Sequence, residues 1–203
     1  MNSGYREVLE DISSDKATPG GGAVSAMVIA HGIALARMVA KLTINREKWK
    51  SGHNSAAQFL IDSEDWIDYS LRLSESDCYA FESVMQAYRM PKGNDEEKEL
   101  RSRAINIANL AATESPLEIM EFGLNVLESI KSMSSTCNSN AITDLGSAIH
   151  IIHSALECAS LNVQVNITSE SENSFEFSKR VEEILTSSHA IKSDVSNIVE
   201  ARM

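Results

Sequence analysis

The sequence predicts an all-α protein, a single domain over residues 1–203 built as a bundle of about six helices. It contains only nine glycines and three prolines, about half the usual share of these two helix-breaking residues. Aromatic residues, which favour strands, make up 5% of the chain. Apolar residues recur at three-, four- and seven-residue steps, which is the repeat of a helix face. A chain of 203 residues is long enough for one full hydrophobic core.

The first two predicted helices flank a glycine-rich loop. Residues Tyr5–Ile12 form a short amphipathic pattern, and a loop follows as far as Pro19. From the triple glycine to about Leu42 the chain carries two ladders of small residues at i, i+4 spacing: Ala26, Ala30 and Ala34, and Gly32, Ala36 and Ala40. Small side chains on several faces let neighbouring backbones approach closely, so we expect this helix to be central.

The middle of the chain predicts one very long or two nearly continuous helices between about Asn54 and Met90, because no glycine or proline interrupts the apolar pattern. The turn at Pro91–Asn94 ends it. A polar helix is then expected from about Asp95 to Thr113. Ser115, followed by Pro116 and by Glu118, has capping-box spacing, which predicts a new helix running to about Met133.

The last part of the chain predicts two more helices. Asn138–Asn140 offers N-caps for a helix towards Leu161. The alternation of apolar and polar residues over Leu161–Ile167 favours a short extended connection. The final helix is expected to start near Asn173, with Glu176 as its capping partner. Long amphipathic helices and small-residue ladders present more apolar surface than one bundle needs, so we expect a homodimer or dimer-based oligomer formed through the long helices.

Charge and cysteine content exclude several classes of function. The net charge of −11 leaves no broad Lys/Arg surface for nucleic acid or an anionic membrane, so neither is expected as a partner. Residues Ala17–Ala36 are uncharged but contain Pro19, His31 and several glycines, which predicts a buried soluble helix rather than a membrane span. Three cysteines without a CxxC pair favour a reducing compartment, and we expect the cytoplasm.

Asp77 is the acidic residue whose surroundings differ from those of the others. At helical spacing it adjoins Ala80, Phe81, Val84 and Tyr88. A carboxylate beside apolar side chains is partly desolvated, which raises its pKa and suits it to proton transfer near neutral pH. The alternative, a structural carboxylate bonded at the edge of the core, stays open at this stage.

Two further patterns have structural and functional interpretations. Gly20–Gly22 precede the central helix, where free backbone N–H groups and the positive end of the helix dipole can meet an anion, although such glycines also serve tight bends. His150, His153 and Glu157 lie at i, i+3 and i+7, as metal ligands in a bundle do. No second helix supplies a matching Glu-x-x-His pair, so we do not expect a metal.

Six segments in order carry a resemblance to a known family. They are Thr18–Ala26, Met38–Thr43, Asp77–Phe81 with Ala87–Lys92, Ser115–Glu118, Asn138–Asp144 and Leu161–Ile167. Together they resemble the formiminotetrahydrofolate cyclodeaminase and methenyltetrahydrofolate cyclohydrolase family. The resemblance extends from about Tyr5 to Ser178. It implies a helical unit that pairs into dimers and binds a tetrahydrofolate derivative near the subunit interface. In bifunctional relatives this unit follows a formiminotransferase domain, so a separate formiminotransferase is a possible partner here.

The resemblance also assigns roles to individual residues. Asp77 matches the catalytic aspartate, which would supply the proton for departing ammonia or manage protons during water addition. Gly20, Gly21, Gly22 and Lys41 become candidates for binding the glutamate tail of the folate. Tyr88 becomes a candidate for stacking on the pterin or aminobenzoyl ring, and Asn140, Asp144 and Asn162 for hydrogen bonds to the pterin edge.

Two alternatives to the folate enzyme remain at the sequence level. One is a metal-binding helical bundle that uses His150, His153 and Glu157. The other is a non-catalytic helical dimerisation module descended from a folate enzyme, in which Asp77 has lost its role. The resemblance also does not choose between deaminase and hydrolase, since both reactions pass through the same carbon and can use the same acid.

Overall fold

The computed structural model describes residues 4–167 and 173–203. Within them the chain forms seven α-helices, two 3-10 helices and no strand. The α-helices are α1 (Tyr5–Ile12), α2 (Gly21–Ile44), α3 (His53–Asp62), α4 (Trp66–Arg89), α5 (Asp95–Ser134), α6 (Ile142–Asn166) and α7 (Ser174–Arg202). The 3-10 helices are Glu47–Gly52 and Ser139–Ala141. The predicted all-α bundle is confirmed.

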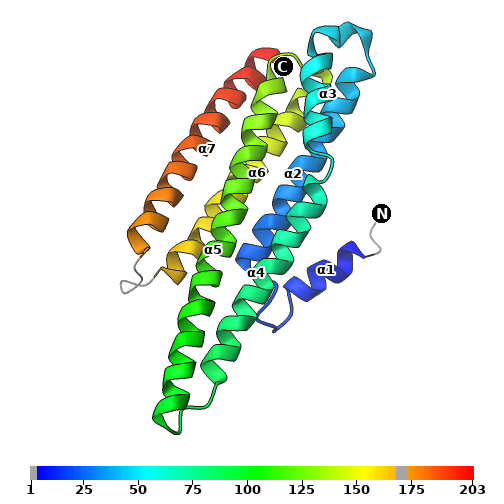
Figure 1. Ribbon diagram of the computed structural model, residues 1–203. Coiled ribbons are helices and arrows are strands. Elements are labelled where there is room, and N and C mark those ends of the chain that lie inside the picture. Colours follow the sequence, from blue (N-terminus) through cyan, green and yellow to red (C-terminus); the bar gives the residue numbers. More distant parts are fainter. Residues whose placement is uncertain (1–3, 168–172) are drawn as a thin grey trace.

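Helix α2 lies at the centre of the bundle, between α4 and α6 (Figure 1). It runs antiparallel to both: Ser70 of α4 donates a hydrogen bond to the carbonyl of Ala26 at 2.7 Å. Towards α6, a Cβ atom added at Gly32 would lie 2.3 Å from Ile152. The small-residue ladders therefore do what their spacing predicts, since they let α2 approach two neighbours closely.

Helix α2 is also the one helix in the described residues that is long and apolar enough to cross a membrane by length and composition. In this fold, 56% of that apolar stretch is buried inside the bundle. Its residues Ala26, Ile29, Ile33 and Ala36 are fully covered by neighbouring helices. The hydropathy of α2 is thus accounted for by its place in the protein core.

The predicted helical stretch from Asn54 to Met90 is two helices, α3 and α4, separated by a short break. Arg37 of α2 stabilises the break: its guanidinium donates to the carbonyl of Ser63 at 2.5 Å and to the Ser63 hydroxyl at 2.8 Å. These bonds tie the end of α3 to α2 and add to the local hydrogen bonds of Ser63, whose hydroxyl donates to the Phe59 carbonyl and whose carbonyl accepts from the Trp66 N–H.

The predicted helix boundary at Ser115 is wrong, because α5 is one helix of 40 residues that continues through Pro116. Proline has no N–H to donate to the carbonyl of Ala112. The side chain of Asn166 on α6 donates to that carbonyl instead, at 2.7 Å. With the orphan acceptor satisfied and helices packed on both sides, burial of the apolar face keeps α5 continuous.

Two predictions near the end of α6 also need correction. The segment Leu161–Ile167 is helical as far as Asn166 rather than extended. Its alternation does not mark a buried face, since Leu161 and Val165 are exposed while Val163 is buried. Helix α7 starts at Ser174, next to the predicted Asn173, but within the described residues the Asn173 side chain makes no capping hydrogen bond.

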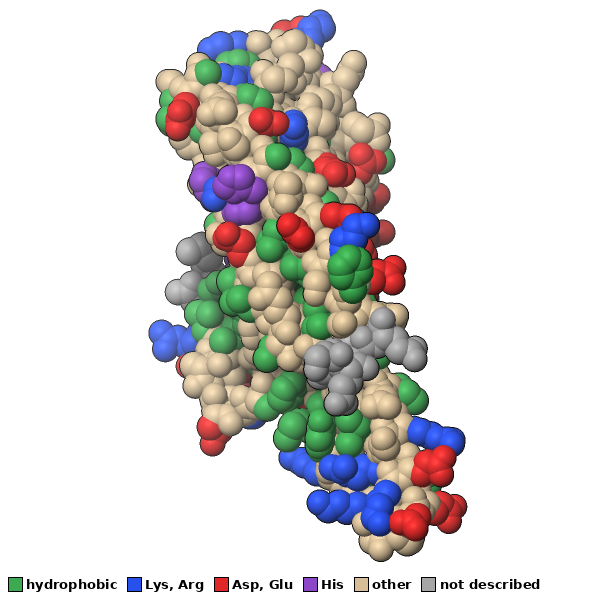
Figure 2. Space-filling model, turned by 90° about the vertical axis from the view of Figure 1, so that its left-hand side faces the viewer, with side chains coloured by type: hydrophobic (Ala, Val, Ile, Leu, Met, Phe, Trp, Pro, Cys, Tyr) green, Lys and Arg blue, Asp and Glu red, His purple; other side chains and the backbone are tan. Residues whose placement is uncertain are grey.

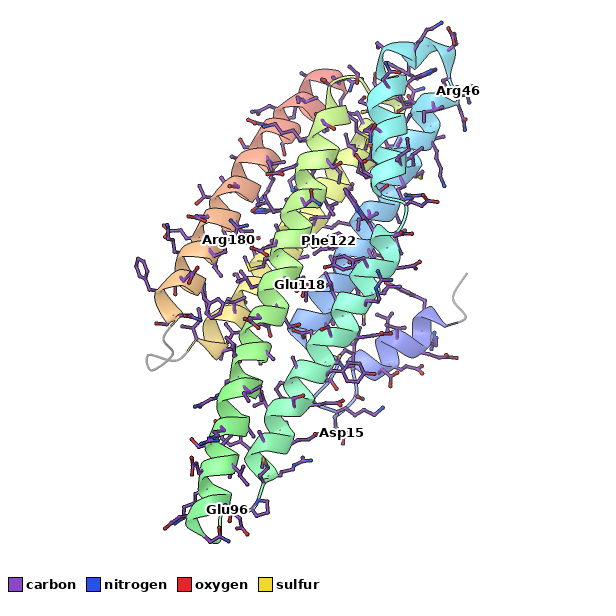
Figure 3. The ribbon with its side chains drawn as sticks, viewed as in Figure 1. Asp15, Arg46, Glu96, Glu118, Phe122 and Arg180 are labelled. Carbon is purple, nitrogen blue, oxygen red and sulfur yellow. The ribbon has the colours of Figure 1, made fainter. Side chains whose placement is uncertain are left out.

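The antiparallel pair α4 and α5 extends beyond the rest of the bundle as a helical hairpin (Figure 1). Glu96, labelled in Figure 3, lies close to its tip. Tyr69 and Glu118 are hydrogen-bonded at 2.7 Å in its upper part, and Arg101 donates to the carbonyl of Tyr88 at 3.1 Å near the tip. These two bonds define the register of the pair. Between them, Asp77 lies level with the start of α2.

Candidate active site

The carboxylate of Asp77 packs directly on Gly22 in the first turn of α2. A Cβ atom added at Gly22 would lie 2.5 Å from Oδ2 and 2.6 Å from Oδ1 of Asp77. No real Cβ tolerates such distances, so any other residue at position 22 would displace the carboxylate. The triple glycine therefore lets a carboxylate touch the backbone at the N-terminus of a helix.

Burial and one hydrogen bond have opposite effects on the proton affinity of Asp77. Partial burial raises the pKa of the Asp77 carboxyl above its ordinary value, and a hydrogen bond from the backbone N–H of Ala23 opposes this increase. Burial is the larger effect. A carboxyl group held in this way binds a proton more readily than an exposed one, which suits it to accepting and returning a proton during a reaction.

Asn162 lies against the same glycine turn from the opposite side. Its Nδ2 atom would be 3.2 Å from a Cβ added at Gly21, and it donates to the carbonyl of Cys158 at 3.1 Å. Gly20 is the N-cap of α2, with extended backbone. The structure therefore brings together Gly20–Gly22, Asp77 and Asn162, which lie far apart in the sequence.

Tyr88 lies on the same face of α4 as Asp77, three helical turns closer to the hairpin tip. Its side chain is 53% exposed. The guanidinium carbon of Arg101 is 5.5 Å from the centre of its ring. Tyr88 is thus available to a ligand that extends along α4 from Asp77.

Lys41, Asn140 and Asp144 lie at the other end of α2. Lys41 is exposed in the last turn of that helix. Asn138 connects Asn140 to this end of α2. Its side chain donates to the carbonyl of Leu42 at 3.1 Å and accepts from the Asn140 backbone N–H at 2.9 Å.

Asp144 follows in the first turn of α6. Twenty residues of helix separate Gly21 from Lys41, which is about 30 Å. In Figure 3, two labelled residues mark the opposite ends of α2: Asp15 lies in the loop before this helix, and Arg46 lies just after it. Within one chain, the two groups of predicted residues therefore cannot contact the same small chemical group.

The three candidate metal ligands on α6 contact α7 or one another. His153 is buried and hydrogen-bonded to Ser188 of α7 at 3.1 Å, and burial lowers its pKa. His150 is exposed and lies 3.5 Å from the Ser196 hydroxyl, and Glu157 lies 3.6 Å from His153. Figure 2 shows histidine side chains gathered on this face. Among the described residues, no group of three or more His, Cys, Asp or Glu side chains is arranged to hold a metal ion.

Sequence reasoning missed three features of the α4–α5 hairpin and its neighbour α6. The Asn166 bond to Ala112 and the buried Ser115 hydroxyl, which has no partner among the described residues, lie where α5 passes Pro116. A proline inside a helical pattern is a signal for such a repair by a side chain, provided that the helix is recognised as continuous. The position of Arg101 against Tyr88 required the hairpin register, which the sequence does not contain.

Known proteins resemble this chain over most or all of its length. Residues 4–184 match the family model described as formiminotransferase-cyclodeaminase. Methenyltetrahydrofolate cyclohydrolase from Methylorubrum extorquens is 31% identical over 204 residues, covering 100% of this chain and 98% of the relative. Formimidoyltransferase-cyclodeaminase from Mus musculus is 24% identical over 175 residues, covering 86% of this chain and 32% of that protein.

A solved structure supports the fold. The crystal structure of formiminotetrahydrofolate cyclodeaminase from Thermotoga maritima aligns with a TM-score of 0.84 at 23% identity. The alignment covers 97% of this chain and 95% of that one. The family match extends over most of the chain and includes the turn at Gly20–Gly22, Asp77 and Asn162. We conclude that this chain belongs to the formiminotransferase-cyclodeaminase family.

Proposed function

We propose that the protein is a folate one-carbon enzyme that hydrolyses 5,10-methenyltetrahydrofolate to 10-formyltetrahydrofolate, with Asp77 as the group that moves protons. The observation that carries the proposal is the Asp77 carboxylate, held against Gly22 with a raised pKa. This carboxylate belongs to a chain that matches a methenyltetrahydrofolate cyclohydrolase along its full length. The family similarity favours this function over a metal-binding bundle or a non-catalytic module.

In the hydrolysis, Asp77 first acts as a base. A water molecule adds to the methenyl carbon while the carboxylate takes one of its protons, and a tetrahedral centre forms between N5 and N10. Asp77 then returns this proton to N5 as the bond from carbon to N5 breaks. The hydroxyl group on carbon loses its proton to solvent and becomes the formyl oxygen on N10. A carboxyl group with a raised pKa suits both transfers.

A cyclodeaminase reaction is the second candidate, favoured by the family model and the mouse relative. In this reaction N10 attacks the carbon of the protonated formimino group on N5. Asp77 takes the proton from N10 and passes it to the amino group of the tetrahedral centre, and the bond from carbon to that nitrogen breaks to release ammonia. A formiminotransferase activity would supply the formimino group for this reaction.

An assay with both substrates separates the two reactions. Methenyltetrahydrofolate has a near-ultraviolet absorption that hydrolysis removes and cyclodeamination creates. We expect the purified protein to remove it from methenyltetrahydrofolate faster than the spontaneous reaction. Formation of the chromophore from 5-formiminotetrahydrofolate would favour the second candidate. Turnover of neither substrate, together with no thermal stabilisation by folinic acid, would contradict the folate proposal.

We further propose that two copies of the chain form the working unit. The two groups of predicted residues lie about 30 Å apart in one chain. The α2–α4 surface between them exposes Met38, Leu42 and Leu71. It also contains an apolar cavity of about 390 Å³, lined by Ala34, Arg37, Met38, Lys41, Leu42 and Ile67. A two-fold pairing through this surface would bring the Lys41 end of one copy towards the Asp77 end of the other.

The cytoplasm is the proposed compartment for this reaction. Cys78, Cys137 and Cys158 are free thiols in the structure. Free cysteines, one of them exposed, are typical of a reducing environment.

A further inference from the structure

The last turn of α7 is fastened to the end of α5 by one side chain. Arg202 donates from one guanidinium nitrogen to the carbonyl of Ser134 and from another to the carbonyl of Cys137. The first of these nitrogens also lies 3.5 Å from the Cys137 sulfur. Figure 1 shows the C-terminus of the chain beside the upper end of α5. The guanidinium thus lies at the negative end of the α5 dipole, where helix carbonyls lack backbone donors.

The proposed reaction gives Arg202 no role, and the match to the family model ends before it, at residue 184. Its charge is not used in an ion pair within the described residues. Ser134 and Cys137, whose carbonyls it binds, are fully buried. A guanidinium is planar and presents its donors in fixed directions, so it constrains both carbonyls at once.

The Cys137 carbonyl belongs to a peptide group that is held from both sides. This group lies in the connection between α5 and α6, residues 135–141, which we call the α5–α6 turn. The N–H of the same peptide group, which belongs to Asn138, donates to the Thr43 hydroxyl at 2.9 Å. Arg202 of α7 therefore holds its oxygen and Thr43 of α2 holds its N–H. Cys137 and Asn138 are buried, so rotation of this group would leave both polar atoms without partners.

This peptide group sets the position of the two binding candidates that follow it. The Asn138 side chain accepts from the Asn140 N–H, and α6 starts two residues after Asn140, with Asp144 in its first turn. Asn140 is exposed and Asp144 is partly exposed. Within the described residues, neither side chain makes a hydrogen bond of its own. Their positions therefore depend on the backbone of the α5–α6 turn.

We propose that Arg202 is a positioning residue, whose bond to the Cys137 carbonyl holds the α5–α6 turn in the form in which Asn140 and Asp144 bind substrate lying at Asp77 of a second copy. The inference rests on the proposed function and on the proposed pairing of two copies. Arg202 itself touches no substrate. Without it the peptide group rotates more freely, so a smaller fraction of the protein has the binding form and affinity falls by that fraction. The proton transfers at Asp77 are unaffected.

The test compares Arg202→Gln with the matched control Arg180→Gln. Both variants remove an α7 arginine that bonds to α5, but Arg180 pairs with Glu121 towards the other end of α7, at 2.7 Å. Below the melting temperature of both, Arg202→Gln should raise the KM for methenyltetrahydrofolate and the Kd for folinic acid about three- to tenfold, with kcat nearly unchanged. Arg180→Gln should change none of the three. An unchanged KM in Arg202→Gln, or an equal increase in the control, would overturn the positioning role.

Two further variants keep the test decisive if Arg202→Gln does not fold. Arg202→Lys keeps the charge at the end of α5, but an ammonium does not have the planar fork that spans two carbonyls, so KM should still rise. Thr43→Val removes the acceptor on the other side of the same peptide group and should also raise KM without lowering kcat. Wild-type KM in both variants would show that the orientation of this peptide group does not matter for binding.

Subunit mixing gives a result that a purely structural role does not produce. After unfolding and refolding together, an Arg202→Gln copy supplies an intact Asp77 and an Asp77→Asn copy supplies an intact turn, so their mixed dimers contain one normal site. Activity at low substrate should exceed the mean of the two variants refolded alone. Mixed with Lys41→Ala, which is defective at the same end, Arg202→Gln should give only the mean. A gain with both partners, or with neither, would overturn the proposal.

Binding of folinic acid separates this inference from the proposed reaction. If the wild type binds folinic acid but turns over neither substrate, the reaction is overturned, and a Kd raised in Arg202→Gln but not in Arg180→Gln still supports the positioning role. Turnover by the wild type with unchanged KM and Kd in Arg202→Gln overturns the positioning role and leaves the reaction standing. Absence of both binding and turnover in the wild type overturns both.

Discussion

The two ends of α2 differ in the chemistry that they offer. At its start, backbone atoms, a partly buried carboxylate and an amide converge, because glycines let Asp77 and Asn162 touch the helix. At its end, Lys41 and Asn140 are exposed on the surface and Asp144 is partly exposed. The first end can change the proton affinity of a group, since it removes water from around it. The second offers charges and hydrogen bonds that need a further surface to become a site.

We therefore propose that the first end carries the chemistry and that the second end contributes to binding. Asp77→Asn is the change with the largest expected effect, because it keeps shape but removes the exchangeable proton. We expect turnover of methenyltetrahydrofolate to fall by about 10²–10⁴, the range typical of a general acid or base. Binding of folinic acid, measured by calorimetry, should stay close to that of the wild type.

The control for this variant is Asp65→Asn, at an exposed carboxylate that precedes α4. It should change neither rate nor melting temperature. If Asp77→Asn keeps wild-type turnover, the catalytic assignment is wrong, and Asp144 is the next carboxylate to test.

Subunit mixing tests whether the second end serves the partner's Asp77. Lys41→Ala should weaken turnover at low substrate by about tenfold, as loss of one charge-assisted hydrogen bond does. When Asp77→Asn and Lys41→Ala dimers are unfolded, mixed and refolded, half of the dimers should contain one site with both residues intact. Activity at low substrate should then reach about a quarter of the wild-type value.

The control for subunit mixing is to unfold and refold each variant alone, which should give no increase in turnover at low substrate. Light scattering establishes the mass in the same samples. A mass of one chain combined with full turnover would refute the shared site.

A double-mutant cycle tests the hydrogen bond from Asn166 that compensates for Pro116 in α5. Asn166→Ala leaves the Ala112 carbonyl without its donor and should lower the free energy of unfolding by about 1–3 kcal/mol. Pro116→Ala restores a backbone N–H at that point, so the added cost of Asn166→Ala should largely vanish in the double variant. Denaturant unfolding of the four proteins measures this coupling. Additive effects would show that the Asn166 bond does not compensate for the proline.

The pH dependence of stability is the smallest expected effect. The folded-state pKa of Asp77 is raised by burial, so its protonated form stabilises the fold and this contribution is lost as pH rises through the raised pKa. Asp77→Asn should therefore melt slightly higher than the wild type at pH 7. The difference should disappear below about pH 4, where the carboxyl is protonated in both states. A variant that melts lower than the wild type at pH 7 would show that the ionised carboxylate stabilises the fold.

The fold could be predicted well from periodicity, and the errors have a common cause. Breaks such as the one at Ser63 depend on Arg37, which is 26 positions away in the sequence. The continuity of α5 through Pro116 depends on Asn166, 50 positions further on in the chain. Local signals such as a capping box report only nearest neighbours, whereas distant side chains decided whether these helices ended.

By itself, the sequence determined the helical class, the central place of the small-residue helix and the choice of Asp77, because periodicity and apolar neighbours are local properties. Only the tertiary structure decided that Gly22 and Asn162 meet at Asp77 while Lys41, Asn140 and Asp144 lie at the other end of the bundle. The physical reason is the antiparallel packing of long helices. A helix of 24 residues carries its two ends far apart, and only the register between neighbours determines which distant residues share a level.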